Sequence, residues 1–338
     1  MQCRPAVVVF LAAVLAALPA AAQDHELVYE FPMDALQRSL RDDRETSLEQ
    51  LLARSVEVVA ARAGEGITVK RTDGRSFVVT VPAARIAELP QLRRRVEAAG
   101  TLEMRIVAAP PRRDAETEFD MPAERRRLQA WLDAGGRDKV LADPRALDTF
   151  HADAERGPVA PGKLRWCVHR IRADAERKGR WSFSFHGLPA FETNCIPLFG
   201  EQQWNDGVVP PAPDGAAATP LVELVALDLQ EIGSTHEDVD TGAVTVQKDG
   251  RSACVFYSIR GARTALYVDW TRKYVGRFCA IVWNGELVSA PRLESALPGH
   301  GIIMGDLSVD ECEDLANALR AGALPAAPRF VISRAADK

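Results

Sequence analysis

The chain has 338 residues, of which 47% are hydrophobic and 26% charged; 42 Lys and Arg against 47 Asp and Glu leave a formal net charge of −5. This composition is typical of globular proteins and excludes a disordered tail protein, a collagen-like rod and a polytopic membrane protein. The mild acidity argues against a nucleic-acid-binding protein, because no domain-wide basic field is available to hold phosphates. The length predicts two or three domains.

Residues 1–22 have the pattern of a secretory signal peptide. Arg4 precedes an apolar run that ends at Leu18, and the three alanines up to Ala22 supply a small-residue cleavage site. Cleavage before Gln23 predicts a periplasmic or secreted protein. The alternative is a single uncleaved N-terminal anchor, because the apolar run is only slightly shorter than the ~17–25 residues that span a bilayer. Membrane contact is expected only in that second case.

Residues 23–108 alternate between strand and helix patterns. The expected elements are a strand at 25–31, a helix at about 45–62, two strands at 67–70 and 77–81, a helix from Pro90 to Gly100, and a strand at 102–107. Asp73-Gly74 between the second and third strands predicts a hairpin. This β-α-β-β-α-β order is that of ferredoxin-like domains. The expected fold class is therefore α+β, a ferredoxin-like base with an inserted α+β head subdomain.

Residues 109–220 are expected to form an insertion or linker, bounded by prolines and rich in tryptophan. The pattern predicts a helix at 124–132 and a hairpin of two strands at 164–172 and 180–186. The segment carries four of the six tryptophans, Trp131, Trp166, Trp181 and Trp204. They could form an aromatic binding surface, but the favoured interpretation is that they stabilise a small irregular insertion.

Residues 221–322 are predicted to form the head, and residues 323–338 a return strand to the base with a C-terminal tail. The head has strand patterns at 244–246, 253–259, 278–283 and 286–290, and a helix pattern at 261–274. The strand at 278–283 is almost continuously apolar, as in a sheet covered on both faces. A last helix is expected to begin at Ser308, with Glu311 completing a capping box, and to end at Gly322.

The cysteines give little evidence of a disulfide framework. Five remain after the signal segment, so at least one is unpaired. Cys167 with Cys195 is the first candidate pair, if any exists, and Cys254 with Cys279 is the next. Cys312 is expected to pack as a small hydrophobic residue on one face of the last helix.

The sequence carries none of the common catalytic or cofactor motifs. No Cys-x-x-Cys, His-Glu-x-x-His, Gly-x-Ser-x-Gly or phosphate-loop pattern is present, and the six histidines are scattered. Asp238 to Gly242 half-resembles a calcium loop, but a tight acidic turn is the favoured interpretation. We therefore expect no enzyme activity, no metal and no small-molecule cofactor. A hydrolase that uses a pair of carboxylates is the least favoured alternative.

Four C-terminal segments resemble a known family. They are 271–277, 280–291, 303–308 and 315–326, the last reading Leu-Ala-Asn-Ala-Leu-Arg-Ala-Gly-Ala-Leu-Pro-Ala. These segments resemble SecD, the accessory subunit of the Sec translocon, in its large first periplasmic domain. Weaker similarity covers 27–107. The resemblance implies a base and a head that together handle emerging polypeptide.

The chain also departs from the SecD pattern. The glycine-rich segment that precedes the base in the family is missing before Leu27, and Val81-Pro82-Ala83 stands where the family has Leu-Pro-Gly. Trp283 and Asn284 replace the usual Leu-Asp. The chain stops at Lys338, where SecD continues into a membrane bundle with ionisable residues for proton coupling, so we expect no proton-driven motor.

The resemblance implies binding of unfolded or exported polypeptide, with Sec translocon components as further partners. An apolar groove near the head–base boundary would be required. The candidate binding residues are Pro291, Leu293, Ile302 and Leu307. The alternative is an envelope interaction module that docks on a translocon or another partner without handling substrate.

Overall fold

The computed structural model describes residues 23–42, 45–108, 121–152, 163–172, 195–198, 221–249, 252–305 and 307–336. The expected signal peptide, the strand expected at 180–186 and two of the tryptophans, Trp181 and Trp204, lie outside these residues. The helices are α1 (Met33–Asp42), α2 (Leu48–Ala63), α3 (Leu89–Glu97), α4 (Met121–Trp131), α5 (Arg137–Ala142), α6 (Leu147–Ala152), α8 (Gly261–Lys273) and α9 (Val309–Ala321). The strands are β1 (His25–Glu30), β2 (Thr68–Arg71), β3 (Ser76–Val81), β4 (Leu102–Val107), β5 (Leu164–Ile171), β6 (Cys195–Pro197), β7 (Leu221–Asp228), β8 (Ser234–Thr235), β9 (Thr245–Asp249), β10 (Ser252–Ser258), β11 (Cys279–Trp283), β12 (Glu286–Ser289), β13 (His300–Ile303) and β14 (Arg329–Ala335). The described part is thus a mixed α+β protein, as expected.

The base sheet has four antiparallel strands in the order β14-β1-β3-β2. The turn between β2 and β3 contains Gly74, whose φ of 53° suits the predicted Asp-Gly hairpin. Ser47 and Gln50 form a capping box at the start of α2. Apolar residues of α2 and α3 pack on one face of the sheet, around Tyr29 and Phe77. The base therefore has a core of its own.

The strand at 102–107 was expected in the base sheet, and this prediction was wrong. β4 instead pairs with β11 in a seven-stranded central sheet of order β6-β7-β5-β12-β11-β4-β8. The reason is that Leu102 and Met104 are fully buried in the core of the head. Buried side chains of this kind need other elements packed against them, and the edge of the base sheet offers no such packing. β14 pairs with β1 in its place.

The segment expected as an irregular insertion supplies a central strand. β5 pairs antiparallel with β7 along its whole length and parallel with β12. Helices α4, α5 and α6 cover one face of these strands, and Trp166 is 1% exposed in the core between them. Trp166 is therefore a core residue and not part of an exposed aromatic surface. The strand predicted at 164–172 is confirmed as β5, which buries apolar side chains on both faces and pairs with strands from the later part of the chain.

The head sheet has three antiparallel strands in the order β13-β10-β9. Helices α8 and α9 bury apolar side chains against it. The predicted capping box of Ser308 and Glu311 and the stop at Gly322 are confirmed, as is the burial of Cys312. β11 is buried on both faces, as its apolar sequence predicts.

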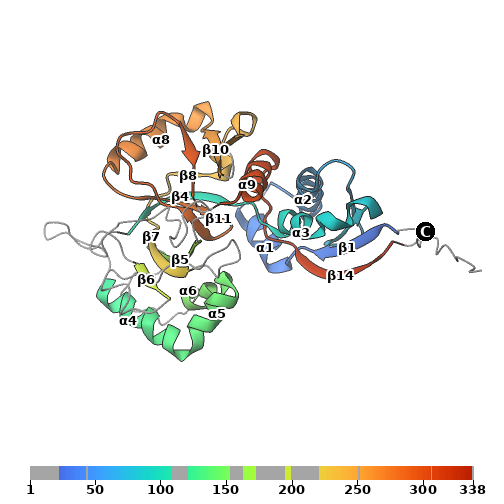
Figure 1. Cartoon of the computed structure of the whole chain (residues 1–338), viewed down its shortest axis with the longest axis horizontal. Coiled ribbons are helices and arrows are strands. Elements are labelled where there is room, and N and C mark those ends of the chain that lie inside the picture. The colour runs from blue at the N-terminus through green and yellow to red at the C-terminus, as the bar shows by residue number, and fades with distance from the viewer. Residues whose placement is uncertain are drawn as a thin grey trace, which may run out of the picture.

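The base lies to one side of the molecule, and the central and head sheets lie to the other (Figure 1). Helix α9 lies at the boundary and contacts α2 of the base. The chain passes from the base to the central sheet between α3 and β4 and returns between α9 and β14. Among the described residues, no helix has the length and apolar character needed to cross a membrane.

Candidate functional site

The hairpin turn between β11 and β12 reaches across to the base. Its backbone has positive φ at Asn284 (52°) and Gly285 (85°), as a tight hairpin turn requires. The backbone N–H of Asn284 donates to Thr101 O at 2.9 Å. Asn284 Oδ1 accepts from the backbone N–H of Gly100 at 2.6 Å. The turn is therefore fixed to the outgoing connection between base and central sheet.

Arg62, on α2, holds both connections between the base and the rest of the chain. Its guanidinium donates to the carbonyl oxygens of Ala98 and Ala99 on the outgoing connection and of Gly322 on the returning one. Its side chain is 2% exposed, and burial lowers the pKa of Arg62 to about 10. Gly100 has a φ of 75°, which favours glycine, and a Cβ there would lie 1.9 Å from Nη2 of this guanidinium, so any larger residue would also displace Arg62.

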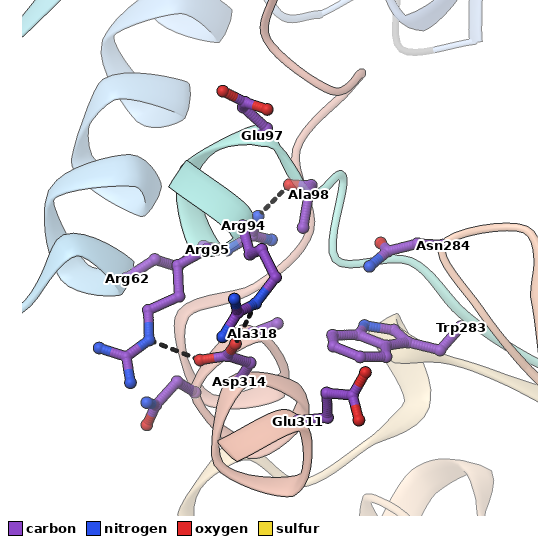
Figure 2. A pocket seen from close by; sticks show the side chains of 11 residues that line it. Arg62, Arg94, Arg95, Glu97, Ala98, Trp283, Asn284, Glu311, Asp314 and Ala318 are labelled. Atoms are coloured by element: carbon purple, nitrogen blue, oxygen red, sulfur yellow. Dashed lines mark hydrogen bonds and ion pairs between the residues drawn. The ribbon is translucent and has the colours of Figure 1, made fainter. Parts of the chain in front are cut away.

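A pocket of about 260 Å³ lies beside this contact, and we call it the arginine pocket. Arg62, Arg94 and Arg95 approach it from the base, whereas Trp283 and Asn284 approach it from the opposite side (Figure 2). Its remaining lining residues are Glu97, Ala98, Glu311, Asp314, Asn317 and Ala318.

The carboxylates around the arginine pocket have basic partners. Glu311 accepts two hydrogen bonds from Arg172, at 2.6 and 2.7 Å. Asp314 pairs with Arg95 at 2.5 Å, and burial raises its pKa against the opposing effect of that arginine. Glu97 accepts from Arg93 at 2.8 Å.

A larger cleft of about 880 Å³ opens on the other side of the Asn284 turn. It is lined by α1 of the base, by α6 and β5, and by the chain that leads into β14. Glu103 in this cleft accepts from Arg105 and Arg165 at 3.0 and 3.1 Å. Burial opposes ionisation of Glu103, but the two arginines outweigh it and hold its pKa below the ordinary value. The cleft is mainly polar, so it is not the apolar groove that polypeptide binding was expected to need.

The four candidate binding residues have different surroundings. Leu293 is 3% exposed within the core of the head, so its side chain is not accessible to a ligand. Leu307 is half-buried against the same core and lines a small pocket of about 170 Å³ with Trp283 and Val288. Pro291 and Ile302 are exposed, but neither lines this pocket. Of the four, Leu307 alone lines this pocket, whose other lining residues come from β5, β11, β12, α9 and their connections and not from the base.

An exposed apolar strip on β13 contains the candidate residue Ile302 together with Met304, which was not among the candidates. Ile302 is 43% exposed, and Met304, directly after the strand, is 61% exposed. β13 is an edge strand, because within the described residues it pairs only with β10. Exposed apolar side chains beside unpaired strand N–H and C=O groups are the features used when an extended peptide adds to a sheet.

The cysteine and metal expectations can be examined in the described residues. All five cysteines there are free. Cys167 and Cys195 face Val225 from the two neighbouring strands, so two strand spacings of about 5 Å separate them, beyond disulfide reach. Burial raises the pKa of Cys167 and Cys279 to about 12. In the same part of the chain, no group of three or more His, Cys, Asp and Glu side chains could hold a metal ion.

We expect Glu311 to make stability depend on acid pH. Burial opposes its ionisation, but hydrogen bonds from Arg172 and Ser308 outweigh it and hold the pKa of Glu311 below the ordinary value of about 4.3. Its stabilising contribution is therefore complete above about pH 5 and is lost as the pH falls through its lower folded-state pKa. Denaturant unfolding measures the free energy of unfolding at pH values from about 6 to 3. The difference in this free energy between wild type and Glu311→Gln should decrease as the pH falls. Glu57→Gln, at an exposed position of α2, is the control, and a difference that does not vary with pH would contradict the assignment.

Comparison with known proteins relates the C-terminal part of the chain to SecD proteins. Residues 225–326 match the family model for the SecDF P1 head subdomain. Protein translocase subunit SecD of Rhodobacter capsulatus is 38% identical over 102 residues, 30% of this chain and 18% of that protein. SecD of Rickettsia bellii is 33% identical over 99 residues, 29% of this chain and 19% of its own. The resemblance to the SecD family expected from the sequence is confirmed, and the aligned segment spans less than a fifth of each relative.

Solved SecDF chains also align with this chain. A structure titled "Structure and function of a membrane component SecDF that enhances protein export" aligns over 92% of this chain and 100% of its own, with 16% identity and a TM-score of 0.45. A SecDF in a super-membrane-facing form aligns over 93% of this chain and 30% of its own, with 15% identity and a TM-score of 0.47.

Proposed function

We propose that this protein binds extended segments of unfolded or exported polypeptide as part of Sec-dependent protein export. The observation that carries the proposal is the match of residues 225–326 to the SecDF P1 head subdomain, together with relatives named protein translocase subunits. The binding role, the location outside the cytoplasm and the non-catalytic, non-motor character belong to this proposal. Sec translocon components are the further partners that it implies.

The proposed polypeptide contact is the exposed edge of β13. Ile302 and Met304 offer apolar area there, and the free edge of the strand offers backbone donors and acceptors. A peptide that adds as a further strand gains main-chain hydrogen bonds from any sequence, and exposed apolar side chains add affinity. This mode suits a protein that meets many different unfolded chains.

The proposal for the base is a ferredoxin-like unit closed by β14. Its strand order places β14 at the edge beside β1, where the last strand of a β-α-β-β-α-β unit would lie. The segment from β4 to α9 is then inserted between α3 and the closing strand. An insertion with two adjacent connections gives the head a common pivot at Ala98 to Gly100 and Gly322, where Arg62 binds both.

Binding of the purified chain to a fluorescently labelled, reduced and alkylated protein tests the polypeptide contact. The double variant Ile302→Asp, Met304→Asp should weaken binding by about tenfold or more, because two apolar contacts are lost and two charges are introduced. Anisotropy titration at constant salt provides the dissociation constant.

The matched control is Val331→Asp, Ile332→Asp on β14. These residues are 51% and 52% exposed and also lie on an edge strand, but in the base sheet. The control should retain binding within about twofold. Equal losses in the two variants would contradict a contact at β13, and no binding by the wild-type chain would contradict the proposed function.

A further inference from the structure

The arginine pocket contains hydrogen-bond donors that have no acceptor. Trp283 Nε1 and Arg62 Nε are buried N–H groups that find no partner among the described residues. Both side chains line the pocket, and Arg62 is 2% exposed. A buried donor without an acceptor is costly, so groups of this kind point to a ligand that accepts hydrogen bonds.

Arg94 adds a cation that is only loosely held. Its nearest carboxylate oxygen is Asp314 Oδ2, 3.9 Å from its Nε, and its side chain is 53% exposed. Asp314 pairs much more closely with Arg95, at 2.5 Å. Arg94 and Trp283 both line the pocket (Figure 2), and the guanidinium of Arg94 has no closer carboxylate partner among the described residues.

The carboxylates around the pocket already have donors. Arg62, Arg94 and Arg95 line the pocket together with Glu97, Glu311 and Asp314. Glu97 and Glu311 accept close hydrogen bonds from Arg93 and Arg172, which do not line the pocket, and Asp314 accepts one from Arg95. The loosely paired guanidinium of Arg94 and the indole N–H of Trp283 are therefore the donors that a bound acceptor would meet.

The size and walls of the pocket restrict the ligand further. About 260 Å³ accommodates a single residue-sized group but no folded partner. Ala98, Ala318 and the indole of Trp283 provide apolar walls beside the donors. A carboxylate carried on a short apolar body fits both features, because arginines bind carboxylates through paired hydrogen bonds.

We propose that the arginine pocket binds a carboxylate on a short apolar body, supplied by the C-terminal residue of a polypeptide. The residues of the pocket alone support binding of a carboxylate. That the carboxylate belongs to a polypeptide rests on the proposed function. Arg94 and Trp283 Nε1 bind the carboxylate oxygens, and the apolar walls contact the side chain.

Titration of the chain labelled with ¹⁵N-tryptophan tests the proposal. The indole N–H signal of Trp283, assigned by its loss in Trp283→Phe, should shift saturably with N-acetyl-leucine and with a peptide that ends in a free carboxylate. N-acetyl-leucinamide and the amidated peptide should leave it unchanged. Arg94→Gln should weaken binding of the acid by about tenfold, and Arg54→Gln, an exposed arginine of α2 outside the pocket, should not.

Each outcome decides the proposal. An equal shift with the amide, no shift with the acid, or unchanged affinity in Arg94→Gln would overturn it, and a stronger shift with inorganic phosphate would replace the carboxylate by a phosphate ligand. A response to N-acetyl-leucine but not to the peptide acid would retain the pocket and reject the polypeptide source. Binding of unfolded protein at β13 is measured separately with the β13 variants, so the proposed function can fail while this inference stands.

Discussion

Replacing Arg62 by alanine is expected to destabilise the contact between base and head by about 3 kcal/mol. Three backbone carbonyls, of Ala98, Ala99 and Gly322, lose their donor in this variant. Buried acceptors without donors are costly, and bonds to a charged donor are stronger than neutral ones. The variant also no longer has to desolvate a buried guanidinium, which offsets part of that loss. The net destabilisation is therefore smaller than the sum of three separate hydrogen bonds.

Hydrogen exchange measures this effect where it arises. The amides of Gly100 and Leu324, which are hydrogen-bonded to Asn284 and Ala99, should exchange about a hundredfold faster in Arg62→Ala. Arg54→Ala, at an exposed position of the same helix, is the control and should leave both rates unchanged. Arg62→Lys retains the charge but has fewer directed donors, so its exchange rates should lie between those of the wild type and those of Arg62→Ala. Unchanged exchange in Arg62→Ala would show that Arg62 does not hold the connections.

Glu124→Ala is expected to cost about 2–3 kcal/mol in the helical core that covers β5, since it removes the acceptor of the buried indole N–H of Trp166 and of the partly buried guanidinium of Arg127. Glu124 on α4 is fully buried. It accepts from Arg127 at 3.1 Å and from the indole N–H of Trp166 at 3.2 Å. The guanidinium of Arg127 also stacks on Phe150, 3.6 Å from the ring centroid. Loss of the carboxylate leaves both donors without this acceptor.

Glu124→Gln separates the charge from the hydrogen bond. The amide oxygen can still accept from Trp166, so the loss should be clearly smaller than in Glu124→Ala. Near-ultraviolet circular dichroism and hydrogen exchange of β5 report on this core, whereas exchange in the base should not change. Equal effects of the two substitutions would show that the charge, and not the indole hydrogen bond, dominates.

Local sequence signals predicted the elements well, because their causes are local. The Asp73-Gly74 turn requires positive φ, and the capping box of Ser308 and Glu311 satisfies the first N–H groups of α9. The apolar run of β11 predicted a strand buried on both faces, as observed. Each of these features depends on residues that lie within a few positions of one another.

Strand partners could not be predicted in the same way. β4 follows the base elements in the chain but pairs with β11, more than 170 residues later, and β5 pairs with β7 across a long connection. Periodicity identifies a strand but not its neighbour. The pattern of β4 gave no such signal, since Leu102, Met104 and Ile106 share one face and Glu103 and Arg105 lie on the other, and this alternation suits a strand of either sheet.

The arginine pocket shows a second limit of sequence reasoning. Trp283 and Asn284 are visible in the sequence as departures from the SecD pattern. Their significance depends on the hairpin turn reaching Gly100 and on α2 and α3 presenting arginines to the same space. Contacts among residues near 62, 95, 284 and 314 follow only from the tertiary structure.

The proposed binding of polypeptide by the head is tested most directly by site-specific photocrosslinking in cells that export a labelled preprotein. A photoreactive residue at Met304, beside the β13 edge, should form adducts with the preprotein, and one at Val331 on β14 should not. Adducts from position 304 that contain only a fixed envelope partner, or no adducts with the preprotein, would contradict the account and favour an interaction module.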